Sequence, residues 1–137
     1  MTKVFLDTNI MLDLLGKREP FFDSIAKIAT LAEAGELTLV VSALSYSTAN
    51  YILEKTKTHK DILSSLQKFK NISIISDLNE NVIEMALNSD FEDFEDALQY
   101  FCAFQSNCDI ILTRNSKDFK ISTIPTMTAD DFLNKYR

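Results

Sequence analysis

The sequence predicts an α/β fold, a three-layer sandwich in which a parallel sheet of about five strands is flanked by helices. Short apolar segments alternate with longer amphipathic ones along the whole chain, which is typical of strands joined by helical crossovers. Such crossovers are right-handed and return each strand to the same parallel sheet. With 137 residues and 46% hydrophobic side chains, residues 1–137 are expected to form a single domain with its own core.

The strands are predicted from short apolar segments that are bounded by polar residues. Such segments are typical of strands buried in a parallel sheet. The chain contains only two glycines and two prolines, so we expect short loops between the elements. The predicted strands are Lys3–Leu6, Leu37–Val41, Ile72–Ile75, Ile110–Leu112 and Ile124–Met127.

The first helices are marked by start and stop signals. Thr8 can cap a helix that is ended by Gly16. Pro20 can start the second helix, because its fixed φ suits a first turn, and Gly35 follows that helix. Ser42 can cap a third helix through Tyr51, Ile52 and Glu54.

The later helices follow from the same signals. One is predicted over about Lys60–Phe69, and either Leu78 or Asn79 opens the next. Thr128 can cap a last helix over Ala129–Lys135. Before it, a helix is predicted from Phe91 to about Phe104, with an inward face made of Ala97, Leu98, Phe101 and Phe104.

The charge balance is acidic, with 14 Lys and Arg against 20 Asp and Glu and a formal net charge of −6. A passive nucleic-acid binder would carry a basic surface, so this class is disfavoured. An enzyme whose acids are neutralised by metal ions is compatible with this balance. A protein that binds a basic partner segment is compatible as well.

The sequence predicts a cytoplasmic protein. No apolar run approaches the roughly 18 residues that a membrane span needs, so we expect no contact with a membrane. The N-terminus enters a strand at once, so we expect no signal peptide. Cys102 and Cys108 are expected to be ordinary reduced thiols.

Acidic residues adjoin predicted elements that should end near one another. Asp7 directly follows the first strand, and Asp118 follows the fourth. Asp93, Glu95 and Asp96 lie near the start of a helix, where Asp93 and Asp96 share a face. Ligands of open parallel sheets bind outside the carboxyl ends of the strands, so we expect the acids to gather there.

Carboxylates gathered without His or Cys point to Mg²⁺ or Mn²⁺ and to phosphodiester chemistry. Two carboxylates about 4 Å apart repel by about 4 kcal/mol at an effective dielectric near 20. Converging acids would therefore raise their pKa values or capture a cation. Thr8 and Asn9 could hydrogen-bond Asp7 or a phosphate, and Thr113 and Asn115 could hold an acid or a metal-bound water.

Each acid also has a purely structural interpretation. Asp7 could be a helix cap, and the acids before Ala97 could complement a helix dipole. Asp118 could be a surface acid paired with Lys117 or Lys120. Other catalytic classes are disfavoured, because the chain has no glycine-rich phosphate loop and its single histidine lies in a polar segment.

Three segments together resemble the PIN domain family. Phe5–Leu15 resembles the start of the family, and Leu112–Phe119 closely resembles its closing motif. Asp93–Gln99 resembles its third-acid motif, in which an Asp is followed by Ala and an apolar residue. Each motif alone is moderately specific, but their order and spacing make the match strong, and the resemblance covers nearly the whole chain.

The resemblance implies a metal-dependent ribonuclease fold. It implies Asp7, Asp96 and Asp118 as the catalytic, metal-binding acids, with Thr113 and Asn115 supporting them. Bacterial members of this size are often toxins of toxin–antitoxin pairs, inhibited by a small partner and often dimeric. An antitoxin and a homodimer are therefore expected alongside an RNA substrate.

One position departs from the family pattern. Many members carry a glutamate on the helix after the second strand, and Thr48 occupies that place here. Glu54 lies about 600° further around that helix and so faces away. Either Asp93 or Glu95 replaces the missing acid, or the affinity for metal is weaker.

The leading hypothesis is a Mg²⁺- or Mn²⁺-dependent endoribonuclease in which Asp7, Asp96 and Asp118 hold the ion. Asp93 is expected either to be a substitute metal ligand or to support the ligands from outside, and Arg114 and Lys117 are expected to contact substrate phosphate. The second is a non-catalytic PIN module that binds RNA or a protein partner, which the missing glutamate and the negative charge favour. The third is a phosphoacceptor signalling domain using Asp77. This hypothesis is the weakest. Receiver domains carry a pair of acidic residues after the first strand and a lysine after the fifth, and this chain lacks both features.

Overall fold

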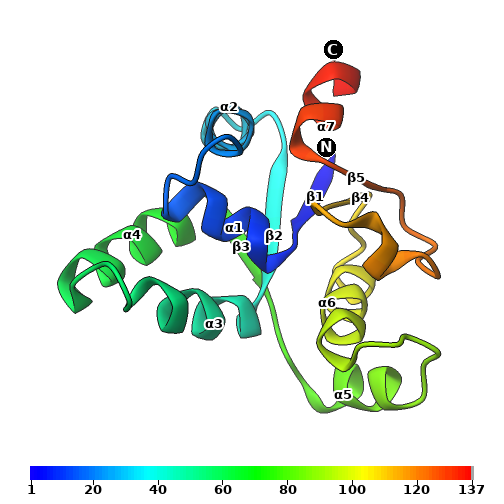
Figure 1. The fold of residues 1–137 in the computed structure, drawn as a ribbon. Coiled ribbons are helices and arrows are strands. Elements are labelled where there is room, and N and C mark those ends of the chain that lie inside the picture. Colours follow the sequence, from blue (N-terminus) through cyan, green and yellow to red (C-terminus); the bar gives the residue numbers. More distant parts are fainter. Residues whose placement is uncertain (137) are drawn as a thin grey trace.

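A computed structural model describes residues 1–136 as one five-stranded sheet with helices on both faces (Figure 1). The strand order is β3-β2-β1-β4-β5, and every neighbouring pair is parallel. The predicted fold class is therefore confirmed. The strands are β1 (Lys3–Leu6), β2 (Thr38–Ser42), β3 (Ser73–Ser76), β4 (Ile110–Leu112) and β5 (Thr126–Met127).

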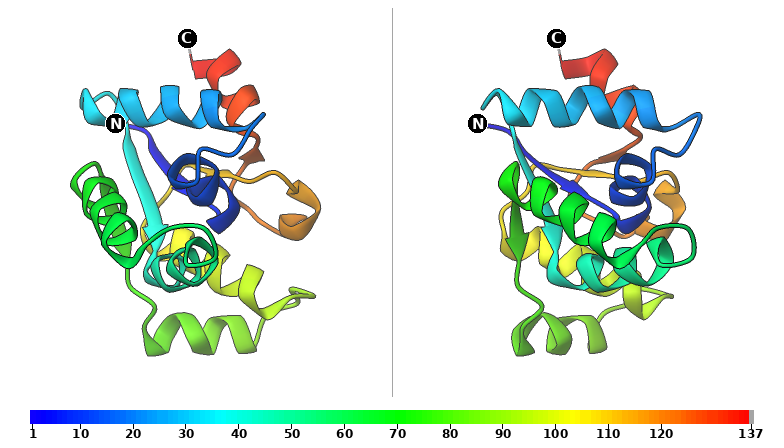
Figure 2. Two further views of the ribbon diagram at one scale, coloured as in Figure 1. Left: turned by 60° about the vertical axis from the view of Figure 1, so that its left-hand side comes forward. Right: turned by 90° about the vertical axis from the view of Figure 1, so that its left-hand side faces the viewer.

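The helices connect the strands as crossovers. In Figure 2, α2 and α7 pack together at one end of the molecule and α5 lies at the other. A short 3₁₀ helix, η1 (Ser116–Phe119), follows β4. The α-helices are α1 (Thr8–Leu15), α2 (Phe22–Glu33), α3 (Ala43–Leu53), α4 (His59–Asn71), α5 (Glu80–Leu87), α6 (Phe94–Gln105) and α7 (Ala129–Tyr136).

Successive residues of β1, β2 and β4 supply two separate cores, because side chains alternate between the two faces of a sheet. Val4 and Leu6 belong to the core under α1, α2, α3, α4 and α7. Phe5 belongs to the other core, under α5 and α6. All three side chains are fully buried. The two cores fix the register of β1, since a slip by one residue would exchange them.

Most of the residues predicted to cap a helix do so in the structure. The side chains of Ser42, Asn79 and Thr128 accept backbone hydrogen bonds from the first turns of α3, α5 and α7. The prediction that Thr8 caps the first helix is wrong. Asp7 is the cap, and Thr8 is the first helical residue, whose N–H donates to the Asp7 carboxylate.

Three further expectations are corrected. The helix predicted from Phe91 begins at Phe94, because Asp93 caps it. The helix predicted from Pro20 begins at Phe22. Phe104 is 51% exposed rather than inward, because α6 turns Cys102 and Ala103 toward the core instead.

Two further features of the structure are the character of its helices and the state of its cysteines. Within residues 1–136, no helix combines the length and the apolar character that a membrane crossing requires. Cys102 and Cys108 are both free and buried. Burial raises the pKa of the Cys102 thiol to about 11 and that of the Cys108 thiol to about 12, so both are inert at neutral pH.

Candidate functional site

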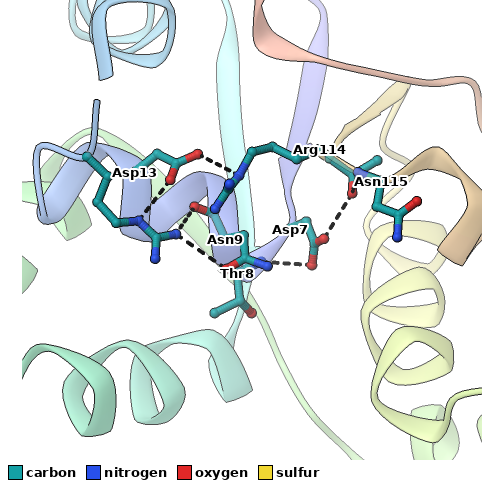
Figure 3. A network of polar contacts seen from close by, with 8 residues as sticks. Asp7, Thr8, Asn9, Asp13, Arg114 and Asn115 are labelled. Carbon is teal, nitrogen blue, oxygen red and sulfur yellow. Dashed lines mark hydrogen bonds and ion pairs between the residues drawn. The ribbon is translucent and has the colours of Figure 1, made fainter. Parts of the chain in front are cut away.

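Asp7 lies where β1 ends and α1 begins. Leu6 is in register with Leu112 of β4, which brings the carboxyl ends of these neighbouring strands together. The Asp7 carboxylate accepts a hydrogen bond of 2.9 Å from the Thr8 N–H and one of 3.0 Å from the Thr113 hydroxyl, as Figure 3 shows in part. Asp7 is therefore both a helix cap and a fixed acid at the sheet edge, so the structural interpretation holds without excluding the functional one.

Asp118 is joined to Asp7 through two polar residues. The Asn115 side-chain amide donates to the Asp118 carboxylate at 3.1 Å, and the Asn115 N–H donates to the Thr113 hydroxyl at 3.1 Å. Thr113 in turn donates to Asp7. The alternative in which Asp118 pairs with Lys117 or Lys120 is not found, since no such ion pair occurs within residues 1–136 and Lys120 pairs with Glu92 at 3.4 Å.

Asp93 and Asp96 come to the site from α6. Asp93 caps this helix and accepts a hydrogen bond of 2.9 Å from the Asp96 N–H, so part of its lone-pair capacity is already used. Both residues line a cleft of about 90 Å³ together with Lys117, Asp118 and Lys120. Asp93, Asp96, Lys117 and Asp118, which the sequence singled out, therefore share one opening.

The acids interact electrostatically as one group. The pKa of Asp96 is raised to about 7, first by burial and then by the charges of Asp118, Asp93, Asp7 and Glu95. Burial also raises the pKa of Asp7, against the hydrogen bonds from Thr113 and Thr8, and Asp118 and Glu95 raise it further. Mutual repulsion of this kind is what a bound cation would relieve.

The carboxylates do not form a ready-made chelate. Among the His, Cys, Asp and Glu side chains of residues 1–136, no three are arranged to hold one ion. The oxygen-only donor set fits Mg²⁺ or Mn²⁺, and Mg²⁺ in particular keeps several waters and needs only one or two protein carboxylates. The residues therefore fit such an ion, provided that the side chains close in when it binds.

Thr8 and Asn9 do not turn their side chains toward Asp7. The Thr8 hydroxyl lies 2.7 Å from the Ser45 hydroxyl on α3 and accepts a hydrogen bond of 3.0 Å from the Gln99 amide on α6. The side-chain amide oxygen of Asn9 accepts a hydrogen bond of 3.3 Å from Arg18. Sequence reasoning missed Ser45 and Gln99, although Gln99 lies one helical turn after Asp96 and is 1% exposed.

Arg114 and Thr48 stand apart from the acids. The Arg114 guanidinium pairs with Asp13 through Nε at 3.1 Å and lies 4.1 Å from the centre of the Phe21 ring. Thr48 is half-buried on α3, and within residues 1–136 it makes no side-chain hydrogen bond to the acids. Asp13, which is 1% exposed, was not identified from the sequence, because its apolar neighbours in the chain make it look like a surface position of α1.

Removing the charge of Asp96 is expected to stabilise the metal-free protein. The pKa of Asp96 is about 7 in the folded protein, against 3.8 for an unperturbed Asp. Ionisation of this carboxyl therefore destabilises the folded state increasingly as the pH rises from about 3.8 to about 7. Asp96→Asn should therefore raise the free energy of unfolding by about 1 kcal/mol at pH 8, since solvent screens part of the repulsion. Near pH 4 the difference should vanish.

Urea unfolding of both proteins at the two pH values, with chelator present, measures this effect. Glu84→Gln, an exposed charge change on α5, is the control and should leave the free energy of unfolding unchanged at both pH values. A loss of stability in Asp96→Asn at pH 8 would mean that the acids do not repel one another.

The chain also matches known proteins. The family model described as PIN domain matches residues 3–117. Over 139 aligned residues the chain is 28% identical to Ribonuclease VapC1 of Aquifex aeolicus (strain VF5), covering 98% of this chain and 95% of the relative.

Two solved structures share the fold. One is VapBC2 from Rickettsia felis bound to a DNA fragment from its promoter, with a TM-score of 0.71, 22% identity and coverage of 93% of this chain and 98% of that one. The other is a toxin–antitoxin complex from Klebsiella pneumoniae, with a TM-score of 0.67, 21% identity and coverage of 92% and 97%. With the family match and the acids at the carboxyl edge of the sheet, the chain belongs to the PIN domain family.

Proposed function

We propose that this protein is a Mg²⁺- or Mn²⁺-dependent endoribonuclease. The observation that carries the proposal is the hydrogen-bonded series from Asp7 through Thr113 and Asn115 to Asp118, beside an Asp96 carboxyl whose pKa is raised to about 7. Membership of the PIN domain family and the similarity to Ribonuclease VapC1 of Aquifex aeolicus support the same reaction.

In this proposal Asp7, Asp96 and Asp118 hold the cation and Asp93 assists them from the cap of α6. When bound, the cation supplies Lewis-acid polarisation of the phosphodiester oxygens. Thr113 and Asn115 fix two of the acids before the cation arrives, which lowers the cost of ordering them. Lys117, which lines the cleft, contacts a phosphate of the RNA strand and offsets the negative charge of the site.

Arg114 has a different role from the phosphate contact expected of it. Its Nε is paired with Asp13, and its guanidinium plane lies over Phe21. Both contacts draw the side chain away from the Asp7 carboxylate, as Figure 3 shows. We therefore assign phosphate contact to Lys117 rather than to Arg114.

We also propose that the protein is the toxin of a toxin–antitoxin pair that acts in the cytoplasm, with a basic segment of the antitoxin facing the acids. Its net charge of −6 and its fold likeness to toxin–antitoxin complexes support this partner. A homodimer fits the same family pattern, and sedimentation velocity measures it directly.

Removal of the metal is expected to abolish RNA cleavage. The purified protein, incubated with a mixture of structured RNAs, should cleave them in Mn²⁺, lose activity in EDTA and recover it when Mn²⁺ is returned in excess. Equal cleavage in EDTA would exclude the proposed chemistry. Asp96→Asn prepared in parallel identifies a contaminating nuclease, since such an activity would survive the substitution.

A non-catalytic PIN module is the second candidate. Two observations favour it, namely Thr48 in the place of the family's glutamate and the absence of a three-ligand set within residues 1–136. A folded protein that neither cleaves RNA nor gains thermal stability in Mn²⁺ would support this candidate. Binding of labelled single-stranded RNA without cleavage would then define its activity.

A further inference from the structure

One buried carboxylate beside the candidate site is paired with two partly exposed arginines. Asp13 projects from α1 and its side chain is 1% exposed. Arg18 reaches one carboxylate oxygen through Nε at 2.9 Å, and Arg114 reaches the other through Nε at 3.1 Å, as drawn in Figure 3. The carboxylate is therefore held between two guanidinium groups from different parts of the chain.

Each arginine has a second anchor. Arg18 donates to the Asn9 backbone carbonyl at 3.0 Å and so ties the segment after α1 to the first turn of that helix. Arg114 lies against the Phe21 ring, 4.1 Å from its centre. The guanidinium of Arg114 is thus held by an ion pair from α1 and by an aromatic face next to α2, which fixes both its position and its plane.

Arg114 is flanked in the chain by the two residues that hydrogen-bond the site acids. Arg114 lies between Thr113, which donates to Asp7, and Asn115, which donates to Asp118. A shift of the Arg114 backbone would move both donors together. Asp13 contacts neither Asp7 nor Asp118. It pairs with Arg114, the residue between the two donors.

Stability alone gives little reason for this arrangement. The Asp13 carboxylate loses its water on folding, whereas the Arg18 and Arg114 side chains stay 37% and 33% exposed. The desolvation of the carboxylate and the solvent around the two arginines both reduce the net gain in stability from these ion pairs. Asp13 is surrounded in the sequence by Leu12 and Leu14 and lies on a helix that packs into the core. A charged residue at such a position is better explained by the geometry that it imposes.

We propose that Asp13 is a positioning residue that fixes the loop 113–118 through Arg114, and so sets the spacing of Asp7 and Asp118 for a divalent cation. This inference rests on the proposed function for its cation, but the ordering of the loop is independent of it. Asp13 acts on the cation only through Arg114 and its neighbours.

The loop has three amide hydrogens that report its order. The N–H groups of Asn115, Lys117 and Asp118 donate to the Thr113 hydroxyl, the Asn115 side chain and the Asn115 carbonyl. In Asp13→Asn and in Arg114→Met we expect these amides to exchange at least about tenfold faster in metal-free protein, since their local opening becomes easier. The double variant should exchange no faster than either single one, because both break the same contact.

Affinity for Mn²⁺ supplies the second readout. Asp13→Asn and Arg114→Met should each weaken it by about fivefold to tenfold. Arg114→Lys should recover part of the affinity, because it keeps a cation beside Asp13 while losing the planar guanidinium. Ile62→Ala is the matched control, since it empties a fully buried position of α4 and should lower Tm at least as much without changing either readout.

Unchanged amide exchange in both Asp13→Asn and Arg114→Met would overturn the proposal. So would an equal loss of Mn²⁺ affinity in Ile62→Ala, because general destabilisation would then explain the effect. If Asp13→Asn does not fold, Arg114→Met and Arg114→Lys decide the question by the same two readouts. If wild type binds no Mn²⁺ but the amides respond as expected, the proposed function fails while the positioning role of Asp13 stands.

Discussion

Asp7→Asn is expected to lower Mn²⁺-dependent RNA cleavage by at least about 10³-fold while the protein stays folded. The hydrogen bonds from Thr113 and Asn115 form a series that ends at Asp7. Thr113 donates to Asp7 directly, and the Asn115 N–H donates to the Thr113 hydroxyl. An amide oxygen can still accept from the Thr8 N–H and cap α1. The substitution therefore removes the charge and keeps the local structure.

Single-turnover cleavage of a labelled RNA, with circular dichroism and a urea melt of each protein, measures this expectation. Glu84→Gln changes a charge on the exposed side of α5 and should retain wild-type rates. Cleavage by Asp7→Asn within about tenfold of wild type would remove Asp7 from the catalytic site.

Metal affinity is expected to fall about tenfold between pH 8 and pH 6. The pKa of Asp96 in metal-free protein is about 7, so its ionised fraction drops from about nine tenths to about one tenth over this interval. A cation needs the ionised carboxylate and must displace the proton below that pKa. The pKa of Asp7 is raised as well, so protonation of Asp7 also lowers the affinity for metal as the pH falls.

Calorimetric titration with Mn²⁺ at pH 6, 7 and 8 measures this dependence. Repeating the pH 6 titration in two buffers of different ionisation enthalpy counts the protons released, and we expect about one for each ion bound. An affinity that is constant from pH 6 to pH 8, with no proton release, would show that Asp96 does not ligate the cation.

The sequence predicts the local features of this fold well, because their causes are local. Ser42, Asn79 and Thr128 cap helices in which the bonded N–H lies three residues further along the chain. The β1 strand was predicted with the bounds that it has. Asp7 instead of Thr8 caps α1, because a carboxylate at the end of a strand can serve the sheet edge and the helix together.

The supports of the candidate site could not be predicted, because they depend on long-range contacts. Thr8, Ser45 and Gln99 meet only when α1, α3 and α6 are packed together. Asp13 and Arg114 are likewise joined across most of the chain. The family resemblance predicts which acids form the site, but it gives no account of these contacts.

The central claim is that Asp7, Asp96 and Asp118 bind one divalent cation. Titration of Mn²⁺ into wild type and into Asp96→Asn by calorimetry at pH 8 tests it most directly, because it requires no knowledge of the RNA substrate. Saturable binding at one site in wild type, weakened at least about tenfold in Asp96→Asn, is the predicted result. A wild-type protein that unfolds cooperatively and yet binds no Mn²⁺ would contradict the claim and favour the non-catalytic PIN module.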